Sequence, residues 1–284
     1  MTSLALALVL FAAIVHACWN LLAKRAGGGV VFVWLYAVCS TILWTPLTLN
    51  SFLRVRHSLT LVDLTFLFGS GLIHTAYFVV LQKAYRVGDL SFVYPLARGT
   101  GPALSALGAI VLLGERPTTV GLAGAALVVF AIVVFSKPTG FSIGRQRTIV
   151  LGLTTGVLIA FYTLWDKYAV TDRHIPPILM EWATSATRVI LLLPLALTNW
   201  SEVLTDWKTR RWSAIWIGVL NPLAYLLVLF AMTFTPISYI APSREISILF
   251  GAFLGGHFLG EGDRPRRLVG AAIMVAGIVC LSVA

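Results

Sequence analysis

The sequence predicts an all-α membrane protein with ten transmembrane helices, arranged as two inverted five-helix repeats. Three observations support this prediction: an apolar composition, a series of long apolar segments and a constant internal repeat. Of the 284 residues, 58% are hydrophobic and only 11% are charged, and the mean hydropathy is +0.90. Soluble domains carry about 25% charged residues, so this chain has too few polar side chains to face water on all sides.

The apolar segments are long enough for helices that cross a bilayer, which requires about 20 residues. Runs such as 125–130 are continuously apolar and so lack the alternation of barrel strands, whereas helices satisfy their backbone hydrogen bonds internally in lipid. The expected spans are 3–23, 30–49, 62–85, 91–112, 119–136, 148–170, 177–197, 212–233, 237–258 and 267–283.

The two halves of the chain repeat with one gap-free offset of 146 residues. This offset places Trp19 on Trp165, Arg98 on Arg244, and the Leu-Gly-Glu segment 113–115 on 259–261. Each half has an odd number of spans, so the second half enters the membrane from the opposite side, an arrangement typical of transporters. We expect a first repeat over 1–136, a connector over 137–147 and a second repeat over 148–284.

This pattern resembles the EamA family of the drug/metabolite transporter (DMT) superfamily. Gly114-Glu115 and Gly260-Glu261 follow the fourth span of each half, and Trp19-Asn20 precedes Lys24 near the end of the first span. At the matching position the second half departs from the pattern and has Trp165-Asp166-Lys167. The resemblance implies a permease driven by solute gradients, usually an efflux carrier, in the inner membrane if the source is a bacterium.

The net charge of +10 does not indicate a nucleic-acid partner, because the basic residues lie mostly in short connectors between spans. Such connectors set membrane orientation. Their distribution favours termini outside, since the odd-numbered connectors carry most of the cations, whereas the family resemblance implies termini in the cytoplasm. The orientation stays open, and the expected partners are membrane lipids and a small-molecule substrate.

Arg98 and Arg244 are the leading site residues. An ionisable side chain within a span costs at least about 2.5 kcal/mol and is a functional hypothesis by default. Both arginines lie about eight residues into the fourth span of their half, about 12 Å deep at the helical rise. Pro95 and Pro242 precede them and predict helix interruptions at matching positions, which point to a binding site. The alternative is that Arg98 pairs with Glu245 as a structural bridge.

Other polar residues within the spans complete the predicted site. Glu245 and Asp166 are candidates for proton coupling because an apolar setting favours the protonated form of a carboxyl group, and His16 can titrate near neutral pH. Glu181 and Arg188 share one face of the seventh span and could bridge to other helices. The predicted substrate-binding residues are Arg98, Arg244, Glu245, His74, Tyr77, Trp165, Asn221 and Tyr225, and the proton-coupling candidates are Glu245, Asp166 and His16.

The planar arginine fork suits carboxylate or phosphate, so we expect an anionic or zwitterionic substrate such as an amino acid, an organic acid or a phosphonate-like compound. We expect neither a cofactor nor a metal nor enzymatic activity, because the cysteines and histidines are scattered and no catalytic motif is present. Two alternatives stay open. One is a lipid-acting intramembrane enzyme, if His16, His74 and Glu245 converge; the other is a non-transporting scaffold. The oligomeric state is also open, since one chain could form a complete carrier.

Overall fold

The computed structural model describes residues 1–87, 90–135, 145–248, 250 and 264–284, and in these ranges all regular structure is helical. The helices run in the order α1 (Ser3–Ala26), α2 (Val30–Val55), α3 (Leu61–Val87), α4 (Leu90–Leu112), α5 (Thr119–Phe135), α6 (Arg145–Thr171), α7 (Pro177–Thr198), α8 (Trp200–Met232), α9 (Ile237–Ser243) and α11 (Arg264–Val283).

Six of the described helices are long and apolar enough to cross a membrane, namely α1, α2, α3, α6, α7 and α8. Shorter apolar helical segments cover Leu96–Leu112, Thr119–Val134 and Val269–Val283 in α4, α5 and α11. Large hydrophobic side chains such as Leu61, Val111 and Trp212 are exposed on the outside of the bundle. The predicted all-helical membrane class is therefore confirmed.

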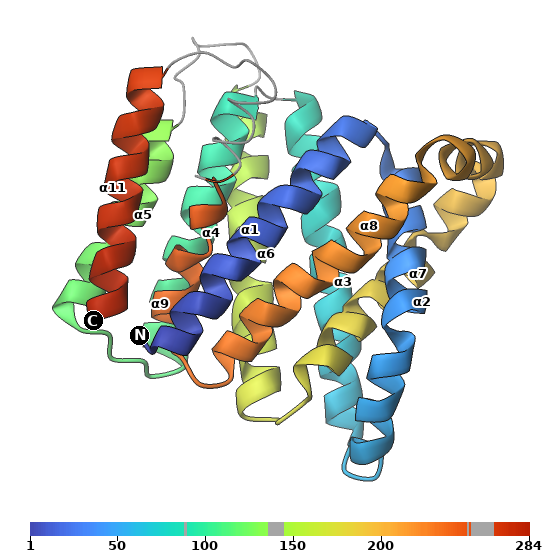
Figure 1. The fold of residues 1–284 in the computed structure, drawn as a ribbon, viewed down its shortest axis with the longest axis horizontal. Helices are drawn as coiled ribbons and strands as arrows, with labels where there is room; N and C mark the ends of the chain where they lie inside the picture. Colours follow the sequence, from blue (N-terminus) through green and yellow to red (C-terminus); the bar gives the residue numbers. More distant parts are fainter. Residues whose placement is uncertain (88–89, 136–144, 249, 251–263) are drawn as a thin grey trace.

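The bundle has two ends that differ in what they carry. Figure 1 shows both chain termini at its lower end, together with the α2–α3, α6–α7 and α8–α9 connections, whereas the α1–α2 and α7–α8 connections lie at its upper end. The terminal amino group of Met1 donates to the carbonyl of Ser282 at 3.4 Å. The end that holds the termini is the lower end of the bundle, and the opposite end is the upper end.

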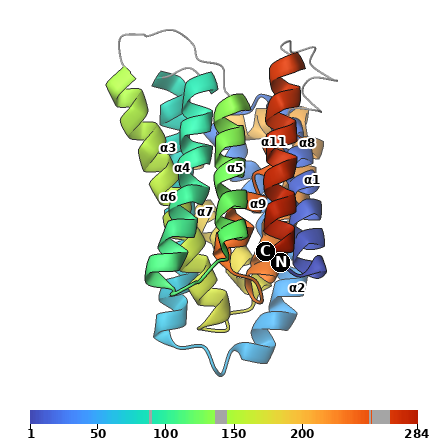
Figure 2. The ribbon, with the colours of Figure 1, turned by 90° about the vertical axis from the view of Figure 1, so that its left-hand side faces the viewer.

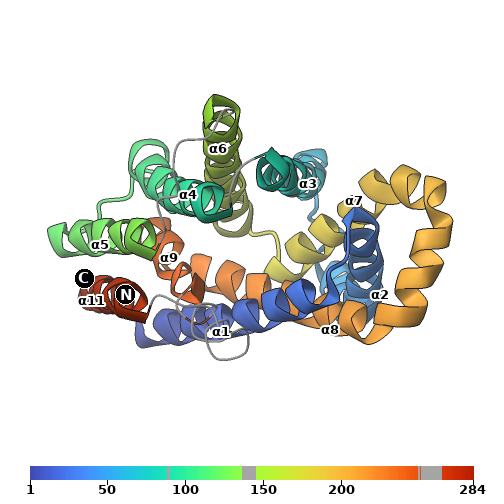
Figure 3. The ribbon, with the colours of Figure 1, turned by 90° about the horizontal axis from the view of Figure 1, so that it is seen from above.

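Viewed from above, the helices form two facing rows with a helix pair at each end (Figure 3). Helices α1 and α8 pack together on one side, and α3 and α4 both pack on α6 on the other. The pair α2 and α7 lies at one end of this arrangement, and the pair α5 and α11 at the other. Figure 2 shows α5 and α11 side by side.

Small residues permit the closest of these helix contacts. A Cβ atom added at Gly277 of α11 would meet the backbone oxygen of Gly124 of α5 at 2.8 Å, and one added at Gly124 would meet the oxygen of Gly277 at the same distance. Only glycine allows two helix backbones to approach in this way, which is how helices commonly pair in lipid.

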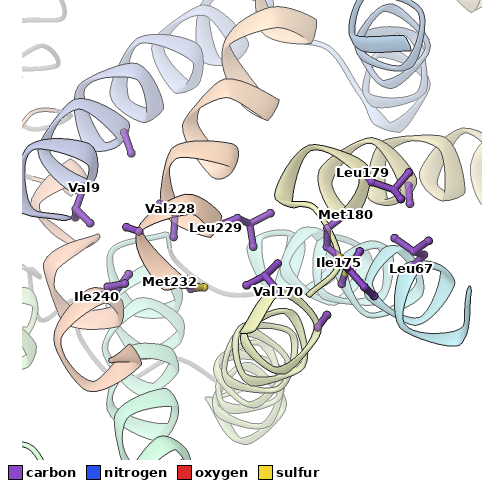
Figure 4. Packing of buried hydrophobic residues seen from close by; sticks show 14 residues of the cluster. Val9, Leu67, Val170, Ile175, Leu179, Met180, Val228, Leu229, Met232 and Ile240 are labelled. Atoms are coloured by element: carbon purple, nitrogen blue, oxygen red, sulfur yellow. The ribbon is translucent and has the colours of Figure 1, made fainter. Parts of the chain in front are cut away.

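The lower end is filled by an apolar cluster contributed by six helices (Figure 4). Its fully buried members include Met180 of α7, Leu229 and Met232 of α8, and Ile240 of α9. Lys167 of α6 ties the same region together by donating to the carbonyls of Met232 at 2.6 Å and Thr235 at 3.1 Å.

An ion pair closes the lower end between α3 and the α6–α7 connection. The Arg173 Nε donates to Asp63 Oδ1 at 2.8 Å, and the second oxygen of Asp63 accepts hydrogen bonds from the backbone N–H and hydroxyl of Thr60. Asp63 thus also caps the start of α3, where the helix dipole favours a negative charge.

One helix begins well before its predicted span. Helix α8 begins at Trp200, twelve residues before the expected span start at 212, and continues through the charged segment 208–211. Exposed Trp200 and Trp207 lie on this extension and exposed Trp212 directly follows it, as is typical of a helix crossing the interface between lipid and water.

Candidate functional site

A polar cavity of about 360 Å³ lies at the centre of the bundle, within the size range of small-molecule sites. Its wall is formed by α1, α2, α3, α4, α6, α7 and α8 and by the residues that follow α9. The lining reaches Ala23, Gly28 and Leu81 near the upper end of the bundle. At its other limit it includes Val9 and Val228, which belong to the lower apolar cluster. The cavity therefore approaches the upper end, and the apolar cluster forms its floor.

A helix break places Arg244 and Glu245. Helix α9 ends at Ser243, and Arg244 and Glu245 form a turn before helical structure resumes at Ile246. At this turn the N–H groups of Glu245, Ser247 and Ile248 donate to carbonyls three residues back, in place of the four of an α-helix. The interruption predicted at Pro242 is thus present.

The matching interruption predicted near Pro95 is absent, because α4 is helical throughout Leu90–Leu112. Pro95 lies in the second turn of this helix, where the loss of one backbone donor does not end it. The side chains of Tyr94 and Pro95, the side chain of Lys24, and Gly260-Glu261 lie outside the described part of the structure.

Arg98 forms one side of the cavity and is paired. Its Nε lies 3.2 Å from Glu245 Oε2, and one terminal nitrogen lies 3.3 Å from Ser247 Oγ and 3.5 Å from His16 Nε2. The Arg98 and Glu245 side chains are only 14% and 5% exposed. The contact with Glu245 is thus a buried ion pair, as the structural alternative expected, although Arg98 also lines the cavity.

Arg244 reaches the cavity from the opposite half of the chain. Its guanidinium carbon lies 5.2 Å from the ring centroid of Tyr225, a cation–π distance, and the structure gives it no ion pair among the described residues. Arg98 and Arg244 therefore line the same cavity, one ion-paired and one resting on an aromatic face.

Behind the Tyr225 ring lies a buried carboxylate. Asp166 of α6 is fully buried, and its Oδ2 accepts a hydrogen bond of 2.5 Å from the Tyr225 hydroxyl. The Nε2 atom of His74 lies 3.8 Å from the same oxygen, and the His74 ring is stacked on Tyr162 with centroids 4.0 Å apart. Asp166 thus does not line the cavity but contacts two residues that do.

The predicted substrate-binding residues fall into two groups. His74, Tyr77, Arg98, Asn221, Tyr225 and Arg244 line the cavity, as does the coupling candidate His16. Glu245 and Trp165 lie outside the lining: Glu245 contacts Arg98, and the Trp165 indole donates to the carbonyl of Phe66 at 3.0 Å. Trp165 also packs on the Phe66 ring, with centroids 4.5 Å apart, so its contacts are those of a packing residue.

Several lining residues were not in the predicted set. Glu181 and Arg188 of α7 both reach the cavity, together with Tyr36, Thr184 and Asn20. The seven-residue spacing of Glu181 and Arg188 had placed them on one helix face but did not show what that face contacts. Asn20 belongs to the Trp-Asn motif of the family resemblance, and its amide nitrogen donates to the carbonyl of His16 at 2.8 Å.

A helical bundle with exposed apolar sides and a central cavity lined by charged side chains is the architecture of a multi-pass membrane protein with an internal site for a small molecule. Residues 146–283 match the sequence model of the EamA-like transporter family, so this second half of the chain is assigned to that family, within the DMT superfamily. Its members are multi-pass integral membrane transporters rather than enzymes.

No curated protein matches the chain. A solved structure described as "Crystal structure of protein" is similar over 100% of this chain and 98% of its own, with a TM-score of 0.76 and 16% sequence identity. At that identity the likeness concerns the fold alone.

Proposed function

We propose that the protein is a secondary carrier that moves a small anionic or zwitterionic metabolite by alternating access, with the substrate bound at the central cavity. The observation that carries this proposal is the meeting of three arginines, Arg98, Arg188 and Arg244, at one polar cavity among membrane helices. Arginine in a water-poor site binds carboxylate or phosphate strongly, because it offers two parallel charge-assisted hydrogen bonds.

The substrate class follows from how these charges are arranged. Arg98 is held by Glu245, whereas Arg244 rests on the Tyr225 ring and Arg188 Nε has no hydrogen-bond partner among the described residues. Arg244 and Arg188 are thus available for the anionic group of a substrate. Glu181 also lines the cavity and suits the ammonium group of an amino acid.

The proposed architecture is ten spans in two inverted repeats, 1–136 and 148–284. Packing supports it. An offset of 146 residues relates α1 to α6, α2 to α7 and α3 to α8, and the contact between α1 and α8 then becomes that between α6 and α3, as observed. In the same way, the offset converts the contact between α2 and α8 into that between α7 and α3, and both contacts are present. Inverted repeats of this kind let a carrier open to alternate sides.

The described conformation suits one state of such a cycle. The cavity approaches the upper end, while the apolar cluster and the Asp63–Arg173 ion pair close the lower end. The charge rule makes the upper end cytoplasmic, and the family resemblance makes it external. The resemblance implies export, although an alternating-access carrier is reversible and follows its solute gradients. One chain contributes both halves, so a monomer suffices.

The test is a thermal-shift screen of the purified protein in detergent. The panel holds carboxylates, amino acids, phosphonates, sugars and lipophilic cations, because a ligand that binds the native state raises its apparent stability. We expect stabilisation by anionic or zwitterionic compounds. In Arg244→Ala their affinity should fall by about 10-fold to 100-fold, the loss of one or two charge-assisted hydrogen bonds.

The matched control is Arg211→Ala, which removes an exposed arginine on α8 outside the cavity and should keep wild-type binding. Stabilisation by cations or sugars alone would refute the anion site and make Arg98 and Arg244 structural. Asp166 and Glu181 would then be the candidate binding residues.

The lipid-acting enzyme required His16, His74 and Glu245 to converge. His16 and Glu245 both lie beside Arg98, whereas the described contacts of His74 are with Ser70, Asp166 and aromatic rings. The carrier is therefore the better supported proposal.

A further inference from the structure

The buried carboxylates of the described residues differ in whether an arginine neutralises them. They are Asp63, Asp166, Glu181, Asp206 and Glu245. Three of them form ion pairs with arginine, whereas Asp166 and Glu181 have no arginine or lysine partner within ion-pair distance among the described residues. An ionised carboxylate buried without a counter-ion is costly, and protonation removes that cost.

Asp166 is the more isolated of the two. Its side chain is fully buried, and Oδ1 has no hydrogen-bond partner among the described residues. Oδ2 accepts from the Tyr225 hydroxyl, which leaves Oδ1 as a position for a proton. Glu181, by contrast, lines the cavity and lies within electrostatic range of Arg188.

The route from the cavity to Asp166 is short. Tyr225 lines the cavity and donates to Asp166 directly. A second chain of polar groups leads from His74, beside Asp166, to Ser70 and on to Thr184 in the cavity wall, with Ser70 Oγ 3.1 Å from Thr184 Oγ1. Hydroxyl and imidazole groups in contact can pass a proton between water in the cavity and the carboxyl group.

The charged and titratable groups that face Asp166 come from each neighbouring element. Helix α3 presents His74, α6 itself Tyr162, α7 Glu181 and α8 Tyr225, and Arg244 approaches from the segment after α9. Arg98 of α4 is paired with Glu245, and the neighbouring Lys167 donates to backbone carbonyls instead. None of these groups forms a permanent ion pair with Asp166.

The charges around the cavity determine whether a proton is needed to keep the site neutral when an anion enters. In the described residues, Arg98, Arg188 and Arg244 line it, and the carboxylates are Glu181 in the wall and Glu245 and Asp166 behind it. While the cavity is empty, the positive charges of Arg188 and Arg244 offset the ionised forms of Asp166 and Glu181, so three cations and three carboxylates cancel formally. An entering anion leaves one negative charge in excess inside a low-dielectric site, and one bound proton restores neutrality.

We infer that Asp166 takes up a proton when the anion binds, so that the carrier moves the anion and a proton together. The inference rests on the proposed function, since it concerns the same cavity. A proton from cavity water forms an O–H bond at Asp166 and leaves on the other side with the anion. Where protons are more concentrated outside the cell, this pairing favours entry of the anion.

The test measures protons taken up on ligand binding. The purified protein in weakly buffered detergent solution receives glutamate, whose own groups do not titrate near neutral pH, or lactate, a monoanion at this pH, if only simple carboxylates gave a thermal shift. A pH indicator should report about one proton per bound anion, and the Kd should rise by up to about tenfold per pH unit on the alkaline side. A carboxylic acid C=O band should appear in the infrared difference spectrum.

Substitutions identify the residue that takes up the proton. Asp166→Asn should bind the same anion with a Kd independent of pH, without proton uptake and without the infrared band, and in proteoliposomes it should exchange anion but not accumulate it in response to a proton gradient. Glu181→Gln removes the cavity carboxylate that suits the ammonium group, so it should bind glutamate more weakly but still take up about one proton per bound anion. Asp206→Asn, which removes a buried carboxylate of α8 that pairs with Arg210 outside the cavity, should behave as wild type.

The outcomes separate the two proposals. If no anion of the panel binds the wild-type protein, the proposed function fails and the coupling falls with it. If an anion binds to the wild-type protein without proton uptake, the proposed carrier stands and only the proton coupling is overturned. This measurement uses the wild-type protein and does not depend on whether any variant folds. Uptake that persists in Asp166→Asn and disappears in Glu181→Gln overturns the assignment to Asp166.

Discussion

The ion pair between Arg98 and Glu245 allows a quantitative test of the site's construction. The substitutions are Arg98→Met and Glu245→Gln, alone and together. At 3.2 Å and an effective dielectric constant of about 20, the Coulomb attraction between unit charges is about 5 kcal/mol. Removing one partner of such a buried pair leaves the other uncompensated and should destabilise the protein by about 3–5 kcal/mol.

The double variant should lose much less than the sum of the two single variants, because it removes both charges and leaves neither unpaired. We expect a coupling free energy of about 2 kcal/mol or more, measured by reversible unfolding in mixed micelles followed by tryptophan fluorescence. The control cycle is Asp206 with Arg210, whose arginine side chain is 37% exposed and should give about 1 kcal/mol or less.

Additive effects, within about 0.5 kcal/mol, would refute the reasoning. They would mean that Arg98 and Glu245 do not depend on each other for charge compensation. A large loss in the Arg98 variant alone would instead show that Arg98 contributes mainly through Ser247 and His16.

Two further predictions concern packing and the closed end. Gly277→Ala should force α11 and α5 apart and cost about 1–3 kcal/mol in the same unfolding assay, whereas Gly99→Ala, with open space around its Cβ position, should be neutral or stabilising. Arg173→Ala removes the ion pair with Asp63 and should favour opening of the lower end by about 1 kcal/mol, or about fivefold. A cysteine at Met180 should then react faster with a water-soluble maleimide, and an unchanged rate would refute the role of this pair as a latch.

Composition and hydropathy predicted the helical membrane class because lipid admits few alternatives. The length of α8 was missed for a physical reason. A span search stops at the charged segment 208–211, but a helix can continue out of the hydrocarbon into the interface, where charged groups are solvated. The amino-acid sequence shows which segments are apolar enough to lie in the hydrocarbon region. It does not show where a helix ends once it has left that region.

The site was predicted in part. Repeat symmetry and the cost of buried charge identified Arg98 and Arg244, which do line one cavity. The same argument expected two interrupted helices, but only the Pro242 break is present, since Pro95 lies too near the start of α4 to end it. The contact between Asp166 and Tyr225 joins residues 59 positions apart, and no pattern in the chain connects them.

The 146-residue offset pairs Asn20 with Asp166. Both belong to the neighbourhood of the cavity, yet one is a neutral amide and the other an acid. A symmetric dimer of identical five-helix subunits would have to carry either two acids or none at such a position. Joining the halves in one chain removes that constraint, so a single carboxyl group can face a cavity built from duplicated parts. In the proposed carrier, fusion of the halves therefore allows one proton-binding carboxyl group at this position instead of a symmetric pair.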